Sequence, residues 1–134
     1  MAAYLFVGTW KLNPAKSKFK AGAPFQEATL TISESGTDDD VALKGTAANG
    51  APFSIHYSLP GNGGTGKIVE AAFDAVSGKL LNARENRITQ SKGGKVLYTV
   101  HSKVSKDGKT LTVAHKGTSA AGQTVDGVWV FDKQ

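Results

Sequence analysis

Cysteine is absent from this 134-residue chain. Without a thiol the chain can form no disulfide, and it offers neither a thiolate nucleophile nor a cysteine-based zinc or iron–sulfur site. No apolar run is long enough to predict a transmembrane segment. Residues 1–4 have neither the charged segment nor the apolar stretch of a signal peptide. We expect a cytoplasmic protein by default, and a mature secreted or periplasmic domain with its leader removed is an equal alternative.

Acidic residues are fewer than basic ones, 11 against 16, which gives a formal net charge of +5. The lysines fall mostly in predicted turns, within 16–20, 92–95 and 106–109. Nucleic-acid binders set base-stacking aromatic residues among the basic residues of one face, and this sequence has no such stripe. We therefore expect no nucleic-acid partner.

Alternating apolar and polar residues fill most of the chain, separated by clusters of Gly, Asn, Asp and Ser. This pattern is typical of an antiparallel all-β domain, and the length predicts a single domain over 1–134. The expected strands are 4–12, 27–34, 41–46, 52–59, 67–73, 79–89, 95–105, 109–117 and 123–132. Because closure removes exposed edges, 8–10 strands predict an up-and-down β-barrel with room for one small ligand.

Two hairpin turns repeat one design, at 91–95 and 105–109. A longer echo sets 41–46 beside 113–118, each containing Lys-Gly-Thr. It indicates either an old duplication or shared hairpin chemistry.

Two segments are predicted to be irregular. The glycine-rich segment 60–66 is expected to be a mobile portal loop, because no helix follows it to cradle a phosphate. Segment 13–26 is expected to cross one barrel end, with a short helical turn near 15–19.

The first predicted strand contains Phe-Val-Gly-Thr-Trp-Lys-Leu, residues 6–12. Together with the chain length, this run resembles the calycin superfamily, that is, lipocalins, fatty-acid-binding proteins and avidins. The resemblance implies a small barrel in which Trp10 packs across the closed end and Gly8 admits close backbone approach.

The sequence also departs from each of these families. Segment 13–26 is short for the helix-turn-helix lid of the fatty-acid-binding proteins, and residues 129–131 read Trp-Val-Phe where those proteins have Arg-x-Tyr. No arginine lies beyond Arg87 to cover the tryptophan as in lipocalins, and two tryptophans are few for an avidin.

Alternation within each strand predicts which side chains face the interior. The inward sets are Phe53, Ile55, Tyr57 and Leu59 on one strand, and Val96, Tyr98, Val100, Ser102 and Val104 on another. His56 and His101 should then point outward, whereas His115 should point inward. Because the histidines lie on different faces, we expect no metal site. Nothing in the sequence indicates a cofactor.

The predicted strand 79–89 places Asn82, Arg84 and Asn86 on one face. If that face is internal, Arg84 needs a partner, either Glu70 or an anionic group of a ligand. In the alternative register Arg84 points to solvent.

The leading hypothesis is a carrier or sensor of a small hydrophobic or amphipathic molecule held inside the barrel. Its predicted ligand-binding residues are Arg84, Asn86, Asn82, Tyr57, Tyr98, Phe53, Ile55, Val96 and Val100. The alternative is a cofactor-free lyase, isomerase or cyclase in the same cavity, with Arg84 stabilising negative charge and His115, Tyr98 or Glu70 moving a proton. A third possibility is a packed structural barrel without a cavity. The oligomeric state is left open.

Overall fold

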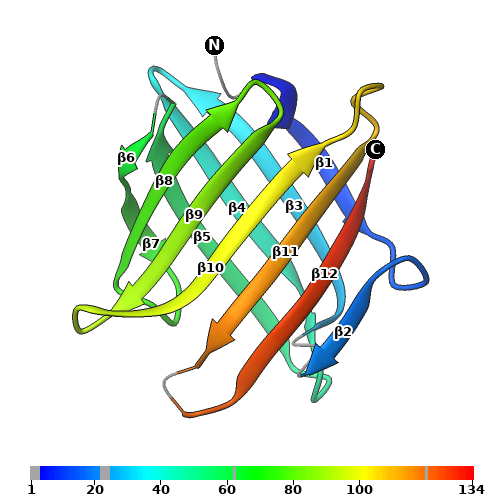
Figure 1. Ribbon diagram of the computed structural model, residues 1–134, viewed down its shortest axis with the longest axis vertical. Coiled ribbons are helices and arrows are strands. Elements are labelled where there is room, and N and C mark those ends of the chain that lie inside the picture. The colour runs from blue at the N-terminus through cyan, green and yellow to red at the C-terminus, as the bar shows by residue number, and fades with distance from the viewer. Residues whose placement is uncertain (1–3, 22–24, 62, 120) are drawn as a thin grey trace.

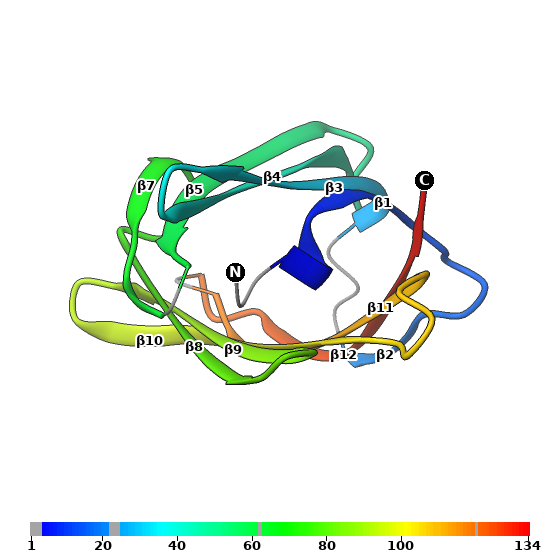
Figure 2. The same cartoon turned by 90° about the horizontal axis from the view of Figure 1, so that it is seen from above.

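A computed structural model describes residues 4–21, 25–61, 63–119 and 121–134. They form one antiparallel sheet that curves into a barrel (Figures 1 and 2). Of the predicted irregular segments, residues 22–24 and Asn62 lie outside the described part.

The long strands follow one another around the wall, as the alternation predicts. They are β1 (Gly8–Leu12), β3 (Phe25–Ser35), β4 (Asp38–Ala47), β5 (Pro52–Pro60), β7 (Lys67–Glu70), β8 (Ala75–Asn82), β9 (Glu85–Lys92), β10 (Lys95–Val104), β11 (Thr110–Thr118) and β12 (Thr124–Lys133). The order is β6-β8-β9-β10-β11-β12-β1-β3-β4-β5-β7, where β6 is the short strand Gly64–Thr65. Up-and-down order therefore holds, with short strands added to the expected 8–10.

The start of the chain differs from the expected strand 4–12. Residues Tyr4–Phe6 form a short 3₁₀ helix, η1, and β1 begins only at Gly8. Seen from above, η1 lies across the opening of the barrel (Figure 2). The end of the barrel that holds η1 is called the η1 end below.

The expected helical turn near 15–19 is also replaced. Residues 14–16 form a turn, after which β2 (Lys18–Ala21) pairs with β12. β1 pairs with the C-terminal half of β12, where Trp10 is opposite Lys133 and Leu12 is opposite Phe131. β1 and β2 therefore lie one after the other along the same edge of β12. A strand thus follows β1, where a two-helix lid would otherwise begin.

The predicted strand 79–89 is wrong, because it consists of two strands, β8 and β9, joined by a tight turn. The turn has no glycine or proline to mark it. Instead the Asn82 side chain accepts a hydrogen bond from the Arg84 amide at 2.9 Å and donates one to Glu85 at 2.6 Å. A side-chain amide can build a turn in this way without positive φ.

The repeated Lys-Gly-Thr has a structural reason. A Cβ added at Gly45 would lie 2.1 Å from the Glu27 carbonyl oxygen, and one at Gly117 would lie 1.9 Å from that of Leu97. Glu27 adjoins the β-bulge between Phe25 and Glu27, and Leu97 lies in the β-bulge between Val96 and Tyr98. At each position the absence of a side chain therefore lets the bulged neighbouring strand come close to the glycine backbone.

One part of the wall is weakly joined. β5 pairs with β7, and β8 pairs with β6, but no pairing links β7 to β6 or β5 to β8 among the described residues. Leu59 packs against Gly78 across this junction, within 3.3 Å of where a Cβ would lie. This packing adds to the backbone hydrogen bond that Gly66, between β6 and β7, donates to the Val76 carbonyl oxygen of β8 at 2.8 Å.

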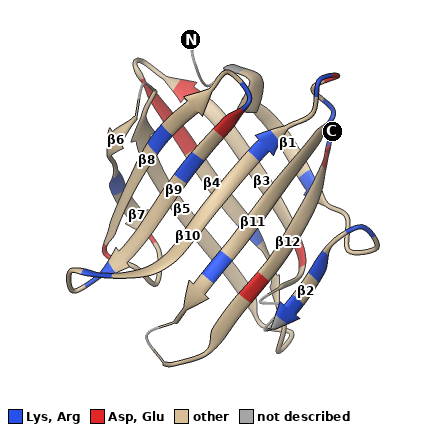
Figure 3. Ribbon diagram, viewed as in Figure 1, with Lys and Arg blue, Asp and Glu red and all other residues tan. Residues whose placement is uncertain are grey.

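Lys and Arg are spread over several strands and turns in the face seen in Figure 3. Among the residues described, no helical segment has the length and apolar character of a membrane span.

Candidate ligand cavity

The barrel encloses a cavity of about 130 Å³ that is mostly apolar. Its lining comes from strands all around the wall, so no single hairpin forms it. The lining residues used below are Phe6, Phe25, Asp39, Ile55, Tyr57, Asn86, Gln90, Val100, Ser102, His115 and Trp129.

At the η1 end the cavity is closed by Phe6, which is 2% exposed. The fully buried Trp10 donates a hydrogen bond from Nε1 to the Phe6 carbonyl oxygen at 2.9 Å, which fixes η1 against the first strand. The Lys133 Nζ lies 5.6 Å from the centre of the Trp10 ring. The last strand thus places the cation of Lys133 over the tryptophan, where lipocalins often have an arginine.

Gly8 lies beside the same lysine. A Cβ there would come within 2.9 Å of Lys133 Cε, and Gly8 has φ of +145°. The close approach at Gly8 is therefore made by a side chain, not by backbone.

Aromatic rings close the opposite end. Phe25 stacks on Phe53 and on Trp129, with ring centres 4.6 Å apart in each pair. Phe19 of β2 lies 4.0 Å from the Trp129 ring, tilted by 55°. Strand β2 therefore contributes an aromatic ring to this closure.

Two hydrogen-bond acceptors of the cavity have no partner among the residues that the structure describes. They are the Oδ1 atoms of Asp39 on β4 and Asn86 on β9, both buried. Asp39 is 8% exposed. Burial raises the pKa of its carboxyl above the ordinary value, and the nearby Glu34 and Asp38 raise it further. Both acceptors belong to strand ends near η1.

A second polar group of the cavity is His115. Trp129 Nε1 lies 3.4 Å from His115 Nδ1, and an indole nitrogen can only donate. Nδ1 is therefore the acceptor, and Nε2 carries the proton of the neutral ring. Nε2 is buried and has no partner within the described part of the chain, and burial lowers the pKa of His115 to about 4.

Tyr57, Gln90 and Ser102 complete the polar lining. Burial raises the pKa of the Tyr57 hydroxyl to about 12, and the Gln90 amide partly offsets this effect. Tyr57 is therefore a neutral hydroxyl at ordinary pH.

The predicted site residues separate into three groups. Ile55, Tyr57, Val100, Asn86 and His115 line the cavity. Phe53 and Tyr98 are half-buried and pack against the core, and Tyr98 meets His115 edge-on with ring centres 4.8 Å apart. Asn82, Arg84 and Glu70 are not among the lining residues.

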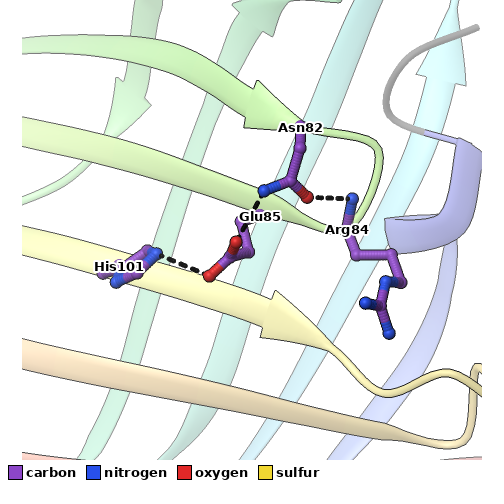
Figure 4. A network of polar contacts seen from close by, with 4 residues as sticks. All are labelled: Asn82, Arg84, Glu85 and His101. Atoms are coloured by element: carbon purple, nitrogen blue, oxygen red, sulfur yellow. Dashed lines mark hydrogen bonds and ion pairs between the residues drawn. The ribbon is translucent and has the colours of Figure 1, made fainter.

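Arg84 lies in the turn between β8 and β9 and not in the middle of a strand, where the inward-facing alternative would place it (Figure 4). Asn82 is exposed at the same turn, and Glu70 is exposed on β7, opposite His56 on β5. Sequence reasoning missed Asp39, because it sits in a run of three aspartates that looks like a surface turn.

Val96 is the exception on the predicted inward face of β10. The bulge between Val96 and Tyr98 turns Val96 outward, where it is 54% exposed, and buries Leu97 instead. His56 and His101 lie on the outer surface and pair with Asp40 at 2.7 Å and Glu85 at 3.4 Å. No three potential ligand side chains gather as a metal site among the described residues.

No family model matches the chain, and no curated protein matches it. Among solved structures, the zebrafish ileal bile acid-binding protein in complex with cholic acid matches 97% of this chain and 99% of its own, at 14% identity and a TM-score of 0.57. The redesigned β-barrel mFAP1 bound to DFHBI matches 98% of each chain at 15% identity and a TM-score of 0.47. The fold is that of a small calycin-like β-barrel.

Proposed function

We propose that the protein binds a small hydrophobic or amphipathic molecule inside the barrel, as a carrier or sensor. The observation that carries this proposal is the cavity itself, an apolar space that contains unpartnered polar atoms. An apolar cavity with a few polar groups is the usual form of a small-molecule site. A fully packed structural barrel would not retain such a space. The bile acid complex of the similar barrel supports the same reading.

The cavity volume bears on ligand size. A cavity of about 150 Å³ in another protein holds benzene, so the 130 Å³ found here suits one ring-sized group. A larger ligand would require the aromatic closure at Phe25 to move.

Binding is favoured over the enzymatic alternative by the placement of the polar groups. The enzymatic alternative assigns the stabilisation of negative charge to Arg84 and proton transfer to His115, Tyr98 or Glu70. Of these residues, only His115 lines the cavity. The titratable side chains of the described lining are His115 and Tyr57, both neutral at ordinary pH, and Asp39.

The first test is native mass spectrometry of the purified protein before and after organic extraction. A defined mass that is lost on extraction would support the proposal and identify a ligand. That ligand is then titrated into the extracted protein, with the fluorescence of the cavity-lining Trp129 as readout.

A matched pair of variants locates the binding. Val100 lines the cavity, whereas Val96 of the same strand is 54% exposed. We expect Val100→Phe to weaken binding by about tenfold or more, since overpacking costs about 1–3 kcal/mol. Val96→Phe should leave affinity unchanged. Equal effects of both substitutions on affinity, in variants with native unfolding midpoints, would contradict binding inside the barrel.

A further inference from the structure

The polar end of the cavity has a definite hydrogen-bonding character. The described lining residues include no lysine or arginine, and Asp39 is their one carboxylate. Asp39 Oδ1 and Asn86 Oδ1 are buried acceptors to which no described residue donates a hydrogen bond. Asp39 is 8% exposed, so solvent reaches little of it.

Strand register places these two acceptors toward the same end. Asp39 pairs with Glu34 and Leu59 beside the β3–β4 turn, and Asn86 pairs with Leu80 and Ser102 beside the β8–β9 turn. Both turns lie at the same end of the barrel as η1 in Figure 1. The polar group of a ligand at this end of the cavity would therefore face acceptors, with no lysine or arginine among the described lining residues.

A buried acceptor without a donor costs free energy that a suitable ligand would recover. An ammonium, amine, hydroxyl or amide N–H would supply the missing donor. A carboxylate could not supply it, and it would be repelled by Asp39 and its acidic neighbours Glu34 and Asp38.

We propose that the ligand presents a hydrogen-bond-donating polar group, neutral or cationic, to Asp39 and Asn86 at the η1 end of the cavity. This proposal rests on the proposed function. It specifies the ligand class as hydrophobic amines and alcohols, and it excludes fatty carboxylates.

A ligand bound in the opposite orientation, with an anionic group as its polar end, would place that group near His115. His115 Nε2–H has no acceptor among the described residues. His115 is two residues along β11 from Val113, which pairs with Ser102, and Ser102 pairs in turn with Asn86. Two residues of a strand span about 7 Å. His115 Nε2–H can therefore donate a hydrogen bond to the far end of the same ligand, and the ligand series below distinguishes the two orientations.

Three probes that share one ring carry the test: benzylamine, benzyl alcohol and benzoate. Each is titrated at pH 7 into ¹⁵N-labelled protein, and the two indole N–H signals are followed. Trp129 lines the cavity, whereas Trp10 is fully buried behind Phe6, so a ligand in the cavity should shift Trp129 most.

We expect the amine and the alcohol to bind about tenfold or more tightly than benzoate, since a hydrogen bond to a charged group contributes about 1.5–3 kcal/mol. Benzoate binding as tightly as the other two would overturn the proposal while leaving the barrel a binding protein. Absence of a Trp129 shift with all three probes would overturn the proposed function as well.

Two neighbouring variants assign the effect to Asp39. Asp39→Asn keeps an acceptor but removes the charge, so benzylamine should lose about tenfold in affinity and benzyl alcohol should change little. Asp38→Asn removes the same charge from β4 outside the cavity lining, and both affinities should stay within about twofold. An unchanged preference for amine over benzoate in Asp39→Asn would overturn the role of Asp39.

Discussion

At the scale of single residues, His115 combines an inward position with a hydrogen bond that fixes its tautomer. Alternation on β11 places its side chain inside, but only the contact with Trp129 indicates which nitrogen carries the proton. Tertiary partners of this kind have no signal in the sequence. The same is true of Lys133 over Trp10, because a lysine near the end of a strand looks like an ordinary surface residue.

The buried His115 makes stability depend on pH. Its pKa is lowered from 6.5 to about 4, so the unfolded chain binds a proton in this range before the folded one does. The stabilising contribution is present above pH 6.5 and is lost as the pH falls toward 4. A shift of this size corresponds to about 3 kcal/mol of unfolding free energy between pH 7 and pH 4.

His115→Phe should remove this dependence while keeping a ring beside Tyr98 and Trp129. Urea unfolding of both proteins at several pH values between 4 and 7 measures it. Wild type should lose about 3 kcal/mol more than the variant over this range. Parallel stability curves for the two proteins would show that His115 titrates normally in the folded state.

At the scale of elements, the sequence predicts most strands but misplaces joins that side chains or bulges determine. Most strand bounds agree with the structure to within a few residues. The β8–β9 turn was missed because Asn82 makes it without glycine, and the exposure of Val96 was missed because a bulge inserts one residue. Because this turn contains Arg84, the arginine does not line the cavity as the predicted site had it.

The glycines of the repeated Lys-Gly-Thr give a prediction at this scale. Gly45→Ala and Gly117→Ala should each lower the unfolding free energy by about 2 kcal/mol or more, because the added methyl group would collide with the backbone of the next strand. Gly108→Ala is the control, since its φ is +73° but nothing lies within 4 Å. It should cost about 1 kcal/mol through backbone strain alone.

Thermal and urea unfolding of the three variants measure these differences. If Gly45→Ala were no more destabilising than Gly108→Ala, the close strand approach at Gly45 would be wrong.

At the scale of the whole molecule, the two barrel ends are closed by different means. Phe6 is 2% exposed and is held by the Trp10 hydrogen bond, whereas Phe25 is half-buried in an aromatic stack with Phe53 and Trp129. The barrel itself follows from alternation and length. The single-ring size of the cavity could not be predicted, because it depends on how the rings at the two ends meet.

This difference predicts which end admits the ligand. Phe25→Ala should speed both ligand association and dissociation, measured by stopped-flow fluorescence, with a modest loss of stability. Phe6→Ala should instead cost about 3–5 kcal/mol of stability, as for a buried phenylalanine, without faster exchange. Faster exchange in Phe6→Ala alone would place the entrance at the η1 end.

The seam between β1 and β12 has a consequence for how the barrel forms and falls apart. Asn13 donates a hydrogen bond to Asp132 at 2.9 Å across a separation of 119 positions, while the β3–β4 and β9–β10 pairs join consecutive strands. Closing so long a loop costs about 2 kcal/mol more than closing a ten-residue hairpin, so we expect the seam to form late in folding. The cavity exists only once the seam is closed, and a bound ligand should therefore slow unfolding without accelerating folding.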